Sequence, residues 1–181
     1  TSGTVTTKSD VKALDGSLNV SGYTGCTVTA STQKDGSNAV AYNAANLANY
    51  RYLKVEPPAM VAEIDGTGCL TLQAAFNAIN TNGKVIKLLQ DTAEAITILG
   101  SSAHSMTLDL NGKTLSHTSL NPIRHDGTGV LTIQDTGTDG KIIGNWDTAT
   151  TIYLWNGGTL NLVSGTVEAI GGDGSTAITV T

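Results

Sequence analysis

The chain has 181 residues, a formal net charge of −5 and a charged fraction of only 14%. This length accommodates one ordinary domain, or a compact domain with a small appendage. The acidic balance provides no basic surface for phosphates, so we expect no nucleic-acid partner. The sequence also lacks the run of about eighteen apolar residues that a membrane-spanning helix needs, so we expect no membrane insertion.

The composition favours strands over helices. Hydrophobic residues make up 39% of the chain, yet the aromatic residues are one Phe, two Trp and five Tyr, so aliphatic side chains have to fill the core. The 21 glycines and the many threonines suit frequent turns and β-branched strands. The composition therefore predicts an all-β fold.

The first part of the chain is polar and rich in turn residues. Alternating stretches at 26–30 and 50–55 are typical of strands. Asp15-Gly16 and Asp35-Gly36 are typical of the turns that join such strands. These features predict a small β-rich segment at the N-terminus.

A domain boundary is predicted where two consecutive prolines, Pro57 and Pro58, remove backbone donors and impose an extended backbone. The segment before them is small for an independent core. We therefore expect a β-rich segment over residues 1–56, a linker over 57–60 and a main domain over 61–181.

One segment has a helical period. Leu72, Ala75, Phe76 and Ile79 are apolar and recur at steps of three and four residues. Thr71 is a suitable N-cap, and we expect the helix to stop at Asn82-Gly83. A single short amphipathic helix before many strands predicts a lid over an exposed hydrophobic end.

From Lys84 onward, short triplets recur at spacings that are too long for hairpins. In most of them two aliphatic residues flank a middle residue. One series, at steps of 22, 23 and 29 residues, is Ile86-Lys87-Leu88, Leu108-Asp109-Leu110, Leu131-Thr132-Ile133 and Leu160-Asn161-Leu162. A second, interleaved series, at steps of 27, 29 and 26 residues, is Ile96-Thr97-Ile98, Ile123-Arg124-His125, Ile152-Tyr153-Leu154 and Ile178-Thr179-Val180.

The two series favour a solenoid. A meander of antiparallel hairpins would join neighbouring strands of one sheet by turns of two to five residues, whereas this repeat skips alternate strands. Each strand is then expected to pair with its counterpart one rung later. Alternation would bury the flanking aliphatic residues and align the middle residues Lys87, Asp109, Thr132 and Asn161 on the outside.

Two cysteines, Cys26 and Cys69, lie far apart in the sequence and outside any metal-binding spacing. A Cys26–Cys69 disulfide would stabilise the fold by roughly 4 kcal/mol in the chain-entropy model. Two unpaired, small hydrophobic side chains are the alternative, because the sequence does not report whether the two Cβ atoms meet.

Four stretches resemble the opening of pectate-lyase-like, right-handed parallel β-helix domains, which are widespread in surface and adhesin-like proteins of Gram-positive and gut bacteria. The stretches are Ile64-Asp65-Gly66, Leu70–Ala75, Gly83–Asp91 and Thr107–Leu115 with its Leu-Asp-Leu-Asn-Gly turn. The resemblance covers about residues 61–181 and implies an N-terminal capping helix, a first rung and an extracellular, secreted or cell-wall-attached protein. Cys69 departs from the usual aromatic or small polar residue, which supports its pairing with Cys26.

This resemblance implies a fold more than an activity, because the same opening precedes lyases, hydrolases and non-catalytic stalks. Asp109 is the first catalytic candidate, since polysaccharide hydrolases place paired carboxylates across such a face. Its predicted ladder neighbours are not acidic, and an Asp at this turn also serves to satisfy backbone donors. Arg124 is a second candidate, as the cation that a lyase needs against a uronate.

Asp135 and Asp139 lie in a turn, Asp135-Thr136-Gly137-Thr138-Asp139-Gly140, that resembles part of a calcium loop. The turn lacks the bidentate Glu of an EF-hand, so turn formation is the simpler role, and a structural calcium ion is the alternative. The three histidines have no metal-pair spacing and are expected to be solvated loop residues. No other cofactor is implied.

Trp146, Tyr153 and Trp155 form the densest group of aromatic residues. Aromatic rings on a flat β-helix face stack on sugar rings, which predicts a carbohydrate-binding site. The rim of the core or a contact with a further rung explains them equally well. An open last rung would also expose a sheet end, so homo-oligomerisation by end-to-end stacking is a further expectation.

These observations favour a non-catalytic module of a secreted or cell-surface protein, in which the β-helix acts as a rigid stalk that binds glycans or a host surface, or self-assembles. A polysaccharide lyase or glycoside hydrolase of the pectate-lyase-like fold is the alternative.

Overall fold

The computed structural model describes residues 3–6, 26–43 and 49–181, and the chain divides into two compact units, Thr1–Ala59 and Met60–Thr181. The predicted turn at Asp15-Gly16 lies outside the described residues. Each unit is described by itself.

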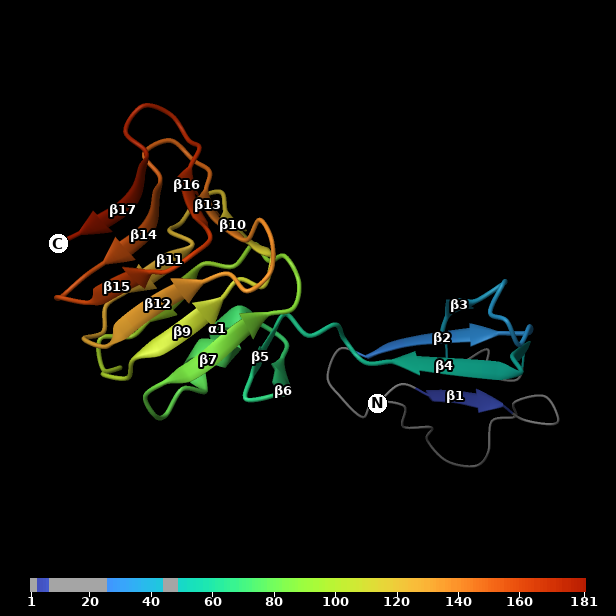
Figure 1. Ribbon diagram of the computed structural model, residues 1–181. Coiled ribbons are helices and arrows are strands. Elements are labelled where there is room, and N and C mark those ends of the chain that lie inside the picture. The colour runs from blue at the N-terminus through green and yellow to red at the C-terminus, as the bar shows by residue number, and fades with distance from the viewer. Residues whose placement is uncertain (1–2, 7–25, 44–48) are drawn as a thin grey trace. The chain divides into compact units, whose positions relative to one another are not determined.

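The first unit contains an antiparallel sheet (Figure 1). Its order is β1 (Gly3–Thr6), β4 (Tyr52–Glu56), β2 (Thr27–Ser31) and β3 (Val40–Ala41). Ala30 and Leu53 are buried and form its small core. The predicted turn at Asp35-Gly36 is present, since Gly36 has a φ of +73° and its N–H donates to the Gln33 carbonyl.

The second unit is a β-solenoid of about four turns, so the all-β expectation is confirmed. Three stacks of strands form its sides (Figure 1). The first stack is β15 (Thr159–Leu162), β12 (Val130–Gln134), β9 (Met106–Asp109), β7 (Lys84–Leu88), β5 (Ala62–Ile64) and β6 (Thr67–Cys69). The second is β17 (Thr176–Val180), β14 (Thr150–Leu154), β11 (Ile123–His125) and β8 (Ile96–Ile98), and the third is β10 (Thr114–His117), β13 (Lys141–Gly144) and β16 (Thr166–Ala169).

Parallel pairing from rung to rung confirms the second predicted series without a shift. Ile96 pairs with Ile123, which pairs with Ile152, which pairs with Ile178. The first three of these side chains are fully buried and stack into an aliphatic ladder. Each buried isoleucine of such a ladder stabilises the solenoid by about 1.5–3 kcal/mol through removal of its side chain from water.

The first predicted series is wrong by two residues at one step. Leu108 pairs with Ile133 rather than with Leu131, so Asp109 lies beside Gln134 and not beside Thr132. A slip of two residues keeps every side chain on the same face of the strand, so the alternating pattern alone did not reveal it.

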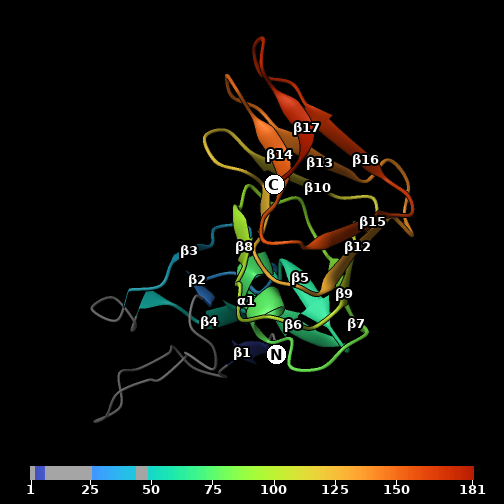
Figure 2. The same cartoon turned by 90° about the vertical axis from the view of Figure 1, so that its left-hand side faces the viewer.

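The helix α1 (Leu72–Asn77) closes the N-terminal end of the solenoid, as the sequence predicted (Figure 2). Its Leu72, Ala75 and Phe76 side chains are buried in the core. Thr71 is the N-cap, and its hydroxyl accepts a hydrogen bond from the Ala74 N–H at 3.0 Å. The helix is shorter than predicted, because its last turn tightens to an Ile79 N–H···Phe76 carbonyl bond.

Hydrogen bonds of two side chains, Glu94 and Gln73, fix the position of this helix. Glu94 accepts hydrogen bonds from the backbone N–H groups of Leu72 and Gln73 at 2.8 and 3.1 Å. The amide of Gln73 lies along the edge of β8, where it accepts from the Thr97 N–H at 2.8 Å and donates to the Thr97 carbonyl at 3.1 Å. A side chain therefore substitutes for the strand that would otherwise pair with β8. Within the described ranges, no helix is long and apolar enough to cross a bilayer.

The last rung is open at the opposite end. Leu162, Ile178 and Val180 are 48%, 36% and 65% exposed, although their ladder partners one rung earlier, Ile133, Ile152 and Leu154, are 0%, 0% and 3% exposed. The same inward positions that form the core elsewhere thus form an apolar layer without a covering rung among the described residues.

Candidate functional site

Four side chains gather on the outer face of the second stack. Arg124 and Asp126 alternate along one strand and its continuation, and Tyr153 and Trp155 alternate along the next. Arg124 pairs directly with Tyr153, and the Trp155 N–H donates to the His125 carbonyl. Alternation along each strand and pairing in register therefore place the four side chains at the corners of one patch, which we call the Arg124–Trp155 cluster.

Contacts inside the Arg124–Trp155 cluster are ionic and aromatic. The Arg124 Nε–H donates to Oδ1 and Oδ2 of Asp126, at 2.8 and 3.0 Å. The Arg124 guanidinium carbon lies 5.8 Å from the centre of the Trp155 ring, a cation–π distance. The rings of Tyr153 and Trp155 are 5.7 Å apart and tilted by 42°. The hydrogen bond and the charge of Asp126 raise the pKa of Arg124, so its guanidinium stays charged.

The cluster is accessible from solvent. Trp155 is 41% exposed, and the side chains of Arg124 and Asp126 are 48% and 18% exposed. The sequence grouped Tyr153 and Trp155 as sugar-binding residues and named Arg124 separately, and the structure brings these three together. Asp126 follows Arg124 by two positions in the sequence, which places its side chain on the same face.

Trp146, the third predicted sugar-binding residue, lies outside the cluster. It precedes β14, whereas Trp155 follows the end of that strand. Its ring lies against Gly144 at the end of β13. The two tryptophans are therefore separated by the length of a strand, and only Trp155 shares a patch with Tyr153.

The prediction that Asp109 lies on an open face is wrong, because this residue is only 4% exposed. Its Oδ1 accepts from the N–H groups of Asn111 and Thr136, at 2.9 and 3.0 Å, and its Oδ2 accepts from the Thr136 hydroxyl at 2.7 Å. Burial alone would raise the pKa of Asp109, but these hydrogen bonds and one from Gln134 outweigh it and lower that pKa. The carboxylate is thus ionised and occupied by the turns around it.

Asp135 serves the neighbouring turn in the same way. Its Oδ1 accepts from the N–H groups of Gly112 and Gly137, at 2.7 and 3.1 Å, and its Oδ2 accepts from Gly140 at 2.8 Å. Burial would raise the pKa of Asp135, but these bonds lower it overall. Asp139 has a φ of +62° in the same turn. In the described parts of the chain, no three His, Cys, Asp or Glu side chains are grouped as a metal site, and the calcium ion stays a prediction.

The prediction that His125 is a solvated loop residue is wrong, because this residue is fully buried in the second stack. It occupies the ladder position between Ile98 and Leu154. The Gly127 N–H donates to its Nδ1 at 3.2 Å, and its Nε2 lies 2.8 Å from the Gly129 carbonyl. These partners require the tautomer with the proton on Nε2. His125 therefore organises the turn after β11 and is not available as a base for a bound substrate.

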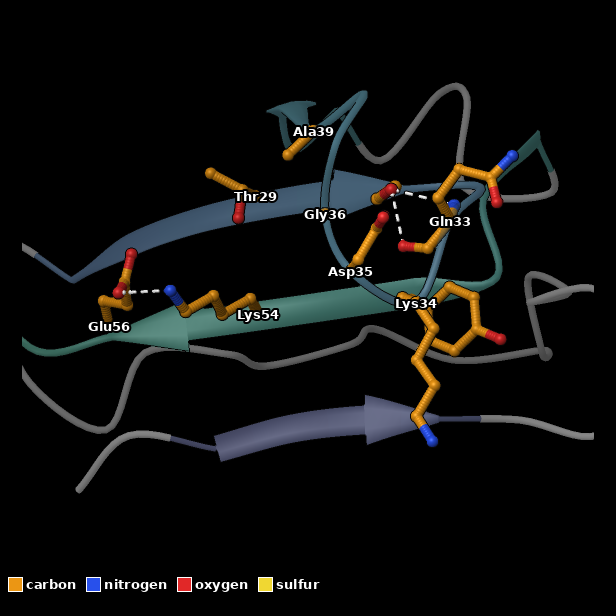
Figure 3. Close-up of a pocket in the computed structure, with 10 residues that line it drawn as sticks. Thr29, Gln33, Lys34, Asp35, Gly36, Ala39, Lys54 and Glu56 are labelled. Carbon is orange, nitrogen blue, oxygen red and sulfur yellow. Dashed lines mark hydrogen bonds and ion pairs between the residues drawn. The ribbon is translucent and has the colours of Figure 1, made fainter.

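The first unit contains a hollow of about 420 Å³ that the sequence did not indicate (Figure 3). Charged side chains line it, but several are already paired: Lys54 lies 2.6 Å from Glu56, and Asp35 accepts from the Ser37 N–H at 3.0 Å. The bonds from Ser37 also lower the pKa of Asp35. The remaining lining residues are Thr29, Ser31, Gln33, Lys34, Gly36, Ala39 and Tyr52.

Cys26 and Cys69 are both partly exposed free thiols in the structure. Burial raises the pKa of the Cys69 thiol. The two residues belong to different units, so the predicted disulfide stays a prediction.

No protein-family model, no curated protein and no solved structure matches the chain. The β-solenoid is therefore established by the structure alone, and the resemblance to pectate-lyase-like domains is an expectation about family.

Proposed function

We propose that the chain is a non-catalytic structural module of a secreted or cell-surface protein, in which the β-solenoid is a rigid spacer that associates through its open last rung. The observation that carries this proposal is the exposure of Leu162, Ile178 and Val180, whose partners one rung earlier are buried. The last strands of the three stacks, β15, β16 and β17, each pair on one side only among the described strands, so their other edges lie beside this apolar layer. Edges of this kind pair readily with further strands.

The two ends of the solenoid differ, which restricts how two copies associate. Leu72, Ala75 and Phe76 of α1 fill the N-terminal end, and Gln73 occupies the edge of β8. Among the described strands, β6 is the free edge of the first stack at the N-terminal end. We propose that the longer C-terminal edge of one copy meets the same edge of another, related by a two-fold axis. Such pairing produces a closed dimer and not a filament.

A structural role also accounts for the acidic residues. The catalytic candidate Asp109 uses both carboxylate oxygens to hold the turns of two rungs together. A carboxylate that acts on a glycosidic bond needs a second carboxylate about 5–10 Å away and access to the substrate. Asp109 is buried, so its geometry favours a role in the fold.

Sedimentation of the full chain over a range of concentrations tests association. We expect a monomer–dimer equilibrium that Leu162→Lys and Val180→Lys shift to monomer, because each introduces an unpaired charge into the apolar layer. Leu99→Lys is the matched control, since Leu99 is 60% exposed but lies outside the last rung. A chain that stays monomeric at all concentrations, or a dimer that survives both substitutions, would contradict the proposal.

Incubation with pectin and mucin tests the absence of catalysis. We expect no sugar release above the background of a heat-denatured sample. Release by the unmodified chain that is lost in Arg124→Ala would replace the structural proposal by a carbohydrate-active enzyme.

A further inference from the structure

The outer face of β11 and β14 has the dimensions of a small ligand site. Neighbouring strands lie about 4.8 Å apart, and residues two apart along a strand lie about 6.6 Å apart. Arg124, Asp126, Tyr153 and Trp155 therefore mark a patch close to the size of one pyranose ring. Threonines flank it on both sides, since Thr97 pairs with Arg124 and Thr179 pairs with Tyr153.

We propose that the Arg124–Trp155 cluster binds a neutral hexose unit of a glycan. Trp155 is 41% exposed, and the part of its ring that Arg124 leaves uncovered would stack on the C–H face of a sugar. The tilted Tyr153 ring beside it and the Arg124 guanidinium above it limit where that sugar lies. A glycan ligand of this kind is compatible with a non-catalytic module and does not depend on association through the last rung.

Polar groups next to the ring match sugar hydroxyls. Asp126 accepts hydrogen bonds, and Arg124 contributes only Nε to Asp126. Among the described residues, none accepts from its two Nη groups, which leaves these donors for a ligand. A pair of adjacent hydroxyls on a hexose can donate to Asp126 and accept from Arg124 at the same time.

The charge of the cluster favours a neutral sugar over a uronate. The positive charge of Arg124 is compensated by Asp126, whose two oxygens lie 2.8 and 3.0 Å from the Arg124 Nε. A uronate carboxylate would have to displace Asp126 or approach its negative charge. A neutral hexose forms the same hydrogen bonds without that repulsion.

The test is affinity electrophoresis of the full chain in native gels that contain β-glucan, galactomannan, galactan or polygalacturonate. Titration calorimetry then follows, with a hexasaccharide of whichever polymer retards the chain. We expect at least one neutral polymer to retard it, and the affinity to fall about tenfold or more in Trp155→Ala, the loss of roughly one stacking contact. Asp126→Asn and Arg124→Gln should each weaken binding, and Trp155→Phe should retain part of it.

Trp146→Phe is the matched control, because it removes the other tryptophan at a distance from the cluster and should leave the affinity unchanged. Circular dichroism of each variant establishes that the solenoid is folded. The inference would be overturned if none of the neutral polymers retards the chain, or if binding survives Trp155→Ala. Retardation by polygalacturonate alone would overturn the assignment to a neutral sugar. Because Val180→Lys leaves the cluster in place, a monomeric variant that still binds separates this inference from the proposed dimer.

Discussion

Thr136 donates two hydrogen bonds to the carboxylate of Asp109, one from its backbone N–H at 3.0 Å and one from its hydroxyl at 2.7 Å. The two residues belong to successive turns of the solenoid and are 27 positions apart. We expect Thr136→Val to lower the free energy of unfolding by about 1–2 kcal/mol, because the carboxylate loses a hydroxyl donor. Thr138→Val, in the same exposed turn, should change it by less than about 0.5 kcal/mol.

Urea unfolding followed by tryptophan fluorescence measures this difference, because both tryptophans lie in the second unit. Equal effects of the two valine substitutions would contradict the role of the Thr136 hydroxyl.

The stability of the solenoid should depend on pH in the acid range. The pKa values of Asp109 and Asp135 are lowered in the folded chain. The unfolded chain therefore takes up protons first, at about pH 4, and stability falls as the pH drops further through the folded values. Fluorescence-detected unfolding between pH 7 and pH 2 should show this loss. In Asp109→Asn the starting stability should be lower and the acid-dependent loss smaller. An unchanged pH profile in that variant would argue against the lowered pKa of Asp109.

Gln73 should contribute to stability through the edge of β8 and not through helix propensity. Gln73→Ala removes the bonds to the Thr97 N–H and carbonyl, and we expect a loss of about 1–3 kcal/mol. Asn77→Ala is the control, because it removes only the exposed Gln73–Asn77 bond of the same side chain. Hydrogen exchange should show faster exchange of the Thr97 amide in Gln73→Ala alone. Protection of that amide in both variants would contradict the proposed substitution for a strand.

His125 should be essential to the second stack despite its polar ring. His125→Ala leaves the Gly127 N–H and the Gly129 carbonyl without their partner and creates a cavity between Ile98 and Leu154. We expect a loss of about 2–4 kcal/mol. His104→Ala, at a half-buried loop position, should cost less than about 0.5 kcal/mol. Similar thermal denaturation of the two variants would show that His125 has no special role.

Local patterns carried much of the fold. The triplets around Ile96, Ile123 and Ile152 marked both the strands and their inward side chains, because alternation along a strand is a local property. Thr71 and the apolar steps from Leu72 onward marked the capping helix for the same reason. Tyr153 and Trp155 could be identified with Trp146 because the three are the densest group of aromatic residues in the sequence.

Only the tertiary structure decided the rest. Pairing Leu108 with Ile133 instead of Leu131 preserves the face of every side chain, so the period of the sequence is the same in either register. The burial of Asp109 and of His125 depends on turns contributed by other residues, Thr136 in one case and Gly127 and Gly129 in the other. Trp146 and Trp155 are separated because Trp146 precedes the start of β14 and Trp155 follows its end. The sequence by itself determined which aliphatic side chains of the strands face the core, because alternation along a strand is local, whereas contacts between rungs decided that the polar side chains of Asp109 and His125 are buried.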